Sequence, residues 1–204
     1  MIQSNPVATP NTPPRAFEGE RDRRSERSMT PAAVDQAFRS MVASFPKLEL
    51  DVNYLHLRDL PDVCELRRQV FAGLPDPDMV LPEPDEEGYV KKLLQPGNAV
   101  IGMRRASDGA LVGYGAVLFS TEESDLPALA GLDPAYRLRS AEIASCMLDK
   151  SLRGHRLQRA FLSVRERIAW ARGRSYLQVM TSPKNGPSRH NLLVAGYALD
   201  GAEI

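Results

Sequence analysis

A turn with a phosphate-binding pattern stands in the C-terminal half of the sequence. A predicted buried strand, residues 140–148, leads through a polar link into the run Leu152-Arg153-Gly154-His155-Arg156-Leu157-Gln158, which opens a predicted helix reaching Arg172. The first turn of a helix has free backbone N–H groups and the positive end of the helix dipole, and a glycine in the turn before it helps to aim them at one point. The pattern therefore indicates a ligand that carries a pyrophosphate.

Other reactive side chains give weaker signals. The two cysteines, Cys64 and Cys146, lie in segments that resemble core elements, and neither has a Cys or His neighbour at metal-ligand spacing. We therefore expect no disulfide framework and no metal. His56 stands alone on a predicted strand, where a structural role is the more common one, and Cys146 has no adjacent His to activate it as a nucleophile.

The composition indicates one globular domain with additional chain. The sequence has 204 residues, 43% of them hydrophobic, and its 26 basic residues balance 26 acidic ones, so nothing points to a nucleic acid or membrane partner. It contains no apolar run of membrane-spanning length and no secretory signal at its start. We expect a soluble, cytoplasmic protein, with secretion by way of the N-terminal tail as the open alternative.

Three segments differ in composition. Residues 1–28 are rich in Pro, Ser, Thr, Arg and Glu and are predicted to form a disordered tail. Residues 29–48 are predicted to form a helix and linker, because Thr30-Pro31 fits a helix start and Val34, Phe38 and Met41 follow at helical spacing. Residues 49–204 would form the main domain.

The main domain is predicted to alternate strands and helices, which favours an α/β class with a mixed sheet. Asp108-Gly109 between two apolar runs predicts a β-hairpin. The predicted strands are 52–57, 99–104, 110–119, 140–148, 176–180 (buried) and one beginning at 196–197; the predicted helices are 61–72, 85–94, 157–172 and one through 192–195.

Residues 73–87 form a proline-rich acidic segment that the prolines keep irregular. One interpretation is an ordinary solvated loop whose last residues, Asp85 to Glu87, suit the first turn of a helix. The other is one wall of a site for a cationic acceptor.

The order of elements and three stretches resemble the GNAT superfamily of acyl-coenzyme A-dependent N-acyltransferases over about residues 52–197. The stretches are Leu148–Gln158, Asn185–Tyr197, and the predicted hairpin with Val112-Gly113-Tyr114. The resemblance implies a central, mostly antiparallel sheet with splayed strands, flanked by helices. The family usually closes with a hairpin, which we expect to be incomplete here because the sequence stops at Ile204.

The resemblance also assigns the phosphate turn, whose family pattern is Arg or Gln, two residues, Gly, one residue, then Gly or Ala. Arg153 and Gly154 fit the first two places, whereas Arg156 replaces the required glycine and Gln158 replaces the last small residue. The Arg156 guanidinium could pair with pyrophosphate oxygens, or its bulk could crowd the turn. By this resemblance, residues 153–158, including His155 and Leu157, would hold the pyrophosphate.

The remaining site residues are implied by the same resemblance. Glu142 lies eleven residues before Arg153, as does the general base of family members that resemble histone acetyltransferases. A solvated or ion-paired Glu142 is the equally weighted alternative. The backbone N–H of Cys146 would hold the acyl carbonyl, and those of Met147 and Leu148 would hold the pantetheine arm.

Two further assignments concern the last predicted helix. Asn185 and Ser188 would contact coenzyme A. Leu192 stands where many members have the tyrosine that protonates the departing thiolate.

The implied function is transfer of an acetyl group from acetyl-coenzyme A to a primary amine within a ternary complex, without a metal. The acceptor would be a small molecule or protein amine, cationic if the acidic segment binds it. The alternative is a weakened or inactive scaffold that binds coenzyme A or a protein, suggested by Arg156, Leu192 and the short C-terminus. A second copy of the chain could also complete the open sheet edge.

Overall fold

The computed structural model describes residues 31–123 and 134–198, so the predicted tail at residues 1–28 lies outside the described part. The helices are α1 (Pro31–Ala43), α2 (Leu60–Ala72), α3 (Glu86–Leu93), α4 (Pro134–Arg137), α5 (Leu157–Ala171) and α6 (Gly186–Val194). The strands are β1 (Leu50–Leu55), β2 (Ala99–Arg105), β3 (Leu111–Phe119), β4 (Ser140–Glu142), β5 (Cys146–Leu148) and β6 (Tyr176–Gln178). Short 3-10 turns connect several of them.

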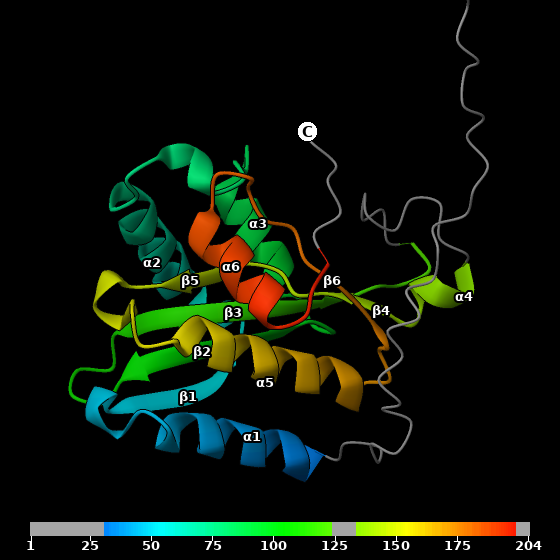
Figure 1. The fold of residues 1–204 in the computed structure, drawn as a ribbon, viewed down its shortest axis with the longest axis horizontal. Coiled ribbons are helices and arrows are strands. Elements are labelled where there is room, and N and C mark those ends of the chain that lie inside the picture. Colours follow the sequence, from blue (N-terminus) through cyan, green and yellow to red (C-terminus); the bar gives the residue numbers. More distant parts are fainter. Residues whose placement is uncertain (1–30, 124–133, 199–204) are drawn as a thin grey trace, which may run out of the picture.

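The strands form one mixed sheet that is mostly antiparallel, which confirms the predicted α/β class (Figure 1). Its order is β1-β2-β3-β4-β6, with β5 paired to β3, and only β4 and β6 run parallel. The central strands β2 and β3 are buried along most of their length, because helices cover both faces of the sheet. Helices α1 and α5 pack on one face, and α2 and α3 pack on the other.

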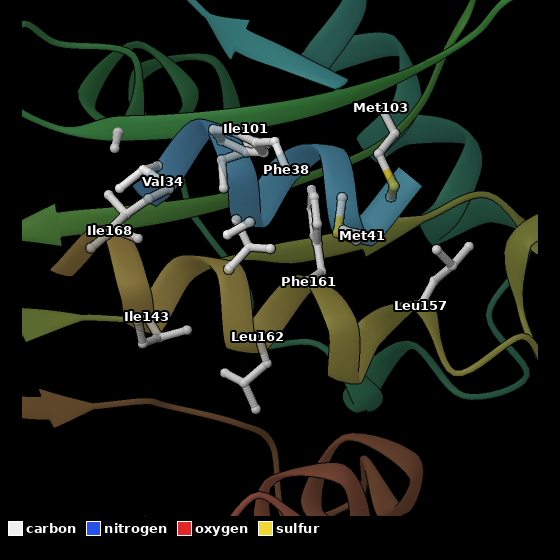
Figure 2. Close-up of a cluster of buried hydrophobic side chains, with 14 of the residues drawn as sticks. Val34, Phe38, Met41, Ile101, Met103, Ile143, Leu157, Phe161, Leu162 and Ile168 are labelled. Atoms are coloured by element: carbon white, nitrogen blue, oxygen red, sulfur yellow. The ribbon is translucent and has the colours of Figure 1, made fainter. Parts of the chain in front are cut away.

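The predicted N-terminal helix is part of one of these layers. Figure 2 shows Val34, Phe38 and Met41 of α1 beside Ile101 of β2 and Phe161 of α5, and all five belong to one buried cluster. Full burial of a side chain such as Phe161 contributes roughly 1.5–3 kcal/mol. Helix α1 therefore helps to hold α5, the helix that follows the phosphate turn.

The predicted continuous strand at residues 140–148 is wrong. Strand β4 ends at Glu142 and β5 begins at Cys146, and between them Ser145 has a φ angle of 32°, which strand geometry does not allow. The last hydrogen bond between this segment and the β6 segment runs from Ile143 N–H to Gln178 O, at 2.8 Å. Beyond it β5 pairs with β3 alone, so the chain after β6 separates from β5.

The predicted buried strand at residues 176–180 is also corrected. Strand β6 has three residues at the edge of the sheet, and Tyr176 and Met180 are 43% and 46% exposed. The segment looks buried in sequence because it is apolar, but one of its sides has no neighbouring strand within the described residues. Residues 195–198 form no strand, so the final strand does not begin at 196–197 as predicted. The rest of the predicted incomplete hairpin, residues 199–204, lies outside the described part.

Candidate functional site

A cleft opens where β5 and the segment after β6 separate. Its volume is about 150 Å³. It brings together six of the residues predicted from the sequence: Glu142, Cys146, Met147, Gln158, Asn185 and Ser188. The rest of its lining includes Arg67 and Tyr89 from the α2–α3 region, residues 79–81 with Glu83, and residues 179–182. Elements from both faces of the sheet thus meet at the break in the predicted strand.

The register of β5 determines which backbone N–H groups face this cleft. Ala116 N–H donates to Ser145 O and Asp149 N–H donates to Val112 O, which fixes the two ends of the β3–β5 ladder. Because hydrogen-bonded pairs alternate along an antiparallel ladder, Met147 exchanges its bonds with Tyr114, its partner in the register. The N–H groups of Cys146 and Leu148 then point away from β3, toward the open side. The Met147 N–H points into the sheet instead, so the register does not leave it free for the pantetheine arm as predicted.

Glu142 presents one of the two carboxyl groups that line the cleft, the other being that of Glu83. Its side chain comes from the end of β4, and the residue is only 5% exposed. Burial raises the pKa of Glu142, and the Glu83 carboxylate raises it further, against the opposing effect of Lys92. Among the described residues, none donates a hydrogen bond to this carboxylate, so it is available to accept a proton from a ligand or water.

The phosphate turn lies beside the cleft and is solvent-exposed from Arg153 to Arg156. Gly154 and Arg156 both have positive φ angles, 84° and 61°. Arg156 therefore adopts the left-handed conformation that a glycine would take without strain, at a cost of roughly 1–2 kcal/mol. Leu157 is buried in the core, so only its backbone can face a ligand.

The predicted coenzyme contacts on α6 already have partners within the protein. Asn185 caps α6 by accepting from Ser188 N–H, and its amide donates to Met79 O. Gln158 donates to Ser188 Oγ at 3.4 Å and accepts from Asn191 at 2.7 Å. These bonds tie α5, α6 and the α2–α3 loop together, and coenzyme binding by the three side chains stays a prediction.

The acidic segment lines the cleft with only some of its residues. Asp76 and Asp78 pair with Lys184, and Asp78 O accepts from Ser182 Oγ, so these groups hold the loop against the β6–α6 connection. Asp85 caps α3 by accepting from Gly88 N–H.

Of the remaining acidic side chains, Glu86 bonds to Arg67 and Glu87 to Lys91. Glu83 is the acidic residue of this segment that lines the cleft.

Two buried arginines next to the cleft were not identified from the sequence. Arg67 on α2 and Arg165 on α5 are each 3% exposed. Helical spacing could have indicated them, because Arg67 lies four residues after the buried Val63 and Arg165 lies four after the buried Phe161. From sequence alone, a charged residue at such a position is usually interpreted as lying at the edge of the buried side of the helix, where its charge reaches solvent.

Leu192, at the position of the family tyrosine, is 4% exposed and belongs to the core cluster. Within the described part, no group of three or more Cys, His, Asp or Glu side chains could hold a metal ion. None of the described helices is both long and apolar enough to cross a membrane.

Comparison with solved structures identifies the fold. A ribosomal-protein-alanine N-acetyltransferase from Brucella melitensis biovar Abortus 2308 superposes with a TM-score of 0.53 and 22% identity, over 76% of this chain and 96% of that one. The aminoglycoside acetyltransferase AAC(6')-Iy, in complex with the bisubstrate analogue CoA-S-monomethyl-acetylneamine, has a TM-score of 0.53 and 18% identity over 76% and 95% of the two chains.

The aminoglycoside acetyltransferase meta-AAC0020, from an uncultured soil metagenomic sample and in complex with sisomicin, has a TM-score of 0.53 and 15% identity over 78% and 95%. Neither the family models nor the curated proteins searched give a match to this sequence. The break between β4 and β5, the cleft beside it and these superpositions agree: the chain has the fold of the GNAT acetyltransferases.

Proposed function

We propose that this protein transfers an acetyl group from acetyl-coenzyme A to a primary amine. One observation carries the proposal: the cleft at the separated strands is lined by both Glu142 and Cys146, and the register turns the Cys146 N–H toward its open side. Acyl transfer to an amine needs a donor for the developing oxyanion and an acceptor for the amine proton. The two groups supply both functions within one cleft.

The chain has a complementary group for each part of the thioester substrate. The Cys146 N–H would donate to the acyl carbonyl and the Leu148 N–H to the pantetheine arm, while the helix start after Arg156 would bind the pyrophosphate. Binding both substrates together makes the attack effectively intramolecular. A buried Leu192 offers no proton for the thiolate, but thiols titrate at about 8.5, so the thiolate can leave near neutral pH.

The charges around the cleft favour a cationic acceptor. Glu83 and Glu142 both line it, and Arg67 is already paired with Glu86 at 2.6 Å. Arg165 also lines the cleft, but its guanidinium donates to the backbone oxygens of Ala144 and Phe161. The carboxylates of Glu83 and Glu142 would then attract an ammonium group and lower the cost of bringing it near the thioester. The ligands of two structural neighbours support a cationic acceptor: AAC(6')-Iy is in complex with CoA-S-monomethyl-acetylneamine, and meta-AAC0020 is in complex with sisomicin.

Titration calorimetry of the full chain with acetyl-coenzyme A, followed by assay of coenzyme A release across a panel of small amines and lysine peptides, tests the proposal. We expect binding in the micromolar range and release that depends on the amine. No binding at millimolar concentration would overturn the proposal.

The loss of the tyrosine at position 192 favours a second candidate, a non-catalytic coenzyme A-binding module. Binding of acetyl-coenzyme A without release across the whole amine panel would favour this module over the enzyme.

Replacing Glu83 with glutamine is expected to raise the acceptor KM about three- to tenfold, because one of the two carboxylates that face the cleft is neutralised. The change should leave the KM for acetyl-coenzyme A unchanged. Asp76→Asn is the matched control, because Asp76 pairs with Lys184 and does not line the cleft. Equal acceptor KM values for the Glu83 and Asp76 variants would show that the acidic segment is not part of the acceptor site. Steady-state kinetics with the amine varied gives the measurement.

A further inference from the structure

The break between β4 and β5 is held by two buried arginines that reach it from opposite faces of the sheet. Arg67 comes from α2, which packs with one core cluster, and Arg165 comes from α5, which packs with the other (Figure 1). Both side chains end at the residues between the strands, Ala144 and Ser145. Burying an arginine side chain costs free energy unless its N–H groups find hydrogen-bond acceptors. The bonds to Ala144 and Ser145 therefore offset part of the cost of burying Arg165 and Arg67.

On the first face, Arg67 Nη1 donates to Ser145 Oγ at 3.1 Å and to Tyr114 Oη at 2.8 Å, and these two hydroxyl oxygens lie 2.7 Å apart. Arg67 Nε bonds to Glu86 Oε2 at 2.6 Å, and the guanidinium carbon lies 4.9 Å from the centroids of both the Phe71 and the Tyr89 ring. Burial by itself lowers the pKa of Arg67, but the bonds to Glu86 and Tyr114 raise it, so the side chain keeps its charge. The guanidinium is therefore fixed in position, and Ser145 is fixed with it.

On the second face, Arg165 Nη1 donates to Ala144 O at 3.0 Å. Gly115 of β3 makes room for this side chain, because a Cβ atom built on Gly115 would lie 3.1 Å from both Cδ and Nε of Arg165. Phe161 Cε1 would lie at 3.0 Å from the same Cβ, so the side chains of Arg165 and Phe161 together leave no room for a side chain at Gly115. Ala144 O also accepts from Ala116 N–H, so this carbonyl is held by two donors.

Ser145 immediately precedes Cys146, and the peptide between them carries the N–H that faces the cleft. Its orientation follows from the backbone angles of Ser145, whose φ of 32° is unfavourable for a residue other than glycine. A strained residue keeps such a conformation only when surrounding contacts impose it.

We propose that Arg67 and Arg165 are positioning residues that hold Ala144 and Ser145 in this conformation and so aim the Cys146 N–H at the acyl carbonyl of the thioester. This inference rests on the proposed function. It extends that function by assigning roles to two residues for which the resemblance to the GNAT superfamily gave none.

The experiment compares two coenzyme A derivatives that differ only in the carbonyl. Acetyl-coenzyme A can accept the Cys146 hydrogen bond, whereas S-ethyl-coenzyme A, a thioether, cannot. For the wild-type chain we expect acetyl-coenzyme A to bind about fivefold more tightly by calorimetry, the usual effect of one hydrogen bond. In Ser145→Ala and Arg67→Met we expect the two affinities to become equal, with that for S-ethyl-coenzyme A retained within about twofold.

A spectroscopic measurement reports the same bond directly. The carbonyl stretch of bound acetyl-coenzyme A labelled with ¹³C should shift to higher frequency in the two variants, because a weaker hydrogen bond polarises the carbonyl less. Arg68→Met is the matched control, since Arg68 is the neighbouring arginine of α2 and pairs with Glu65 at the surface. If Arg67→Met fails to fold, Ser145→Ala, which removes one hydroxyl group, decides the result.

Unchanged preference and unchanged frequency in both variants would overturn the positioning role, as would an equal loss of affinity for both ligands. A wild-type chain that binds both ligands equally overturns it as well. Binding with the expected preference but no amine-dependent release supports the positioning role and overturns catalysis, so the two proposals fail separately. A wild-type chain that binds neither ligand overturns both.

Discussion

Replacing Glu142 with glutamine is expected to lower kcat/KM by about 10²- to 10³-fold, because the amide cannot accept the proton that the attacking amine must lose. Glutamine has nearly the same shape, and the side chain is buried at the end of β4, so coenzyme affinity should change little. Steady-state kinetics with both substrates, together with calorimetry, separates the two quantities. Glu87→Gln is the control, because Glu87 is exposed on α3 and pairs with Lys91.

The pH dependence of the wild-type enzyme follows from the same residue. Burial raises the pKa of Glu142, and the base must be ionised to act, so kcat/KM should rise with pH through that raised pKa. The acidic limb of the profile should vanish in Glu142→Gln. A profile that keeps its acidic limb in the variant would assign the proton transfer to another group.

Glu142→Gln is expected to make the folded protein more stable at neutral pH, although it lowers the activity. A carboxyl group whose pKa is higher in the folded state stabilises the fold at low pH, and this contribution is lost as pH rises through the folded-state pKa. At neutral pH the folded protein therefore bears the cost of a buried charge, which the neutral glutamine removes. Thermal unfolding at neutral pH should show a higher Tm for Glu142→Gln, and a lower Tm would contradict the argument.

Reversing two charges on the phosphate turn should abolish coenzyme binding. Acetyl-coenzyme A at about 100 times its Kd should stabilise the wild-type chain by about 2.7 kcal/mol, which corresponds to a rise in Tm of about 5–10 °C for a protein of this size. Arg153 and Arg156 are both exposed in the turn, so Arg153→Glu with Arg156→Glu would repel the pyrophosphate and remove most of this shift. Arg167→Glu, at an exposed position further along α5, is the control.

The single variant Arg156→Gly distinguishes the two possible effects of Arg156, pairing of its guanidinium with the pyrophosphate and strain in the turn. Glycine relieves the strain of about 1–2 kcal/mol at this position but loses roughly 0.5–1 kcal/mol more chain entropy on folding, so the variant without ligand should be more stable by up to about 1 kcal/mol. If the guanidinium pairs with the pyrophosphate, coenzyme affinity falls several-fold despite this gain. A rise in affinity would show instead that the arginine crowds the turn.

The sequence predicted the regular parts of this fold because their apolar residues repeat with a clear period. Phe161, Val164 and Ile168 mark the buried side of α5, and Gly173 ends the helix with a φ of 73°. The hairpin between β2 and β3 was signalled by Asp108-Gly109, where Gly109 takes the positive φ angle. Such local signals are enough to predict a helix end or a turn, because the backbone conformation there suits glycine in particular.

The cleft could not be predicted in the same way, because the residues that open it carry no local sequence signal. Residues 143–145 read Ile-Ala-Ser, which contain neither glycine nor proline, so nothing in them predicts the break between β4 and β5. The side chains that bond to Ala144 and Ser145, Arg165 and Arg67, come from helices far away in the sequence. Helical spacing could have placed these two arginines near the core, but it could not have shown which backbone atoms they reach.

The parallel pairing of β4 with β6 ends at Glu142, before β5 begins at Cys146, and this has a consequence for local stability. Strand β5 is three residues long and is hydrogen-bonded along one edge only, whereas β2 lies between two long neighbours. Segments with few hydrogen bonds open at a lower free energy than the rest of a domain. The amides of β5 should therefore exchange with solvent long before those of β2, and a ligand lying along the free edge would act as the missing strand.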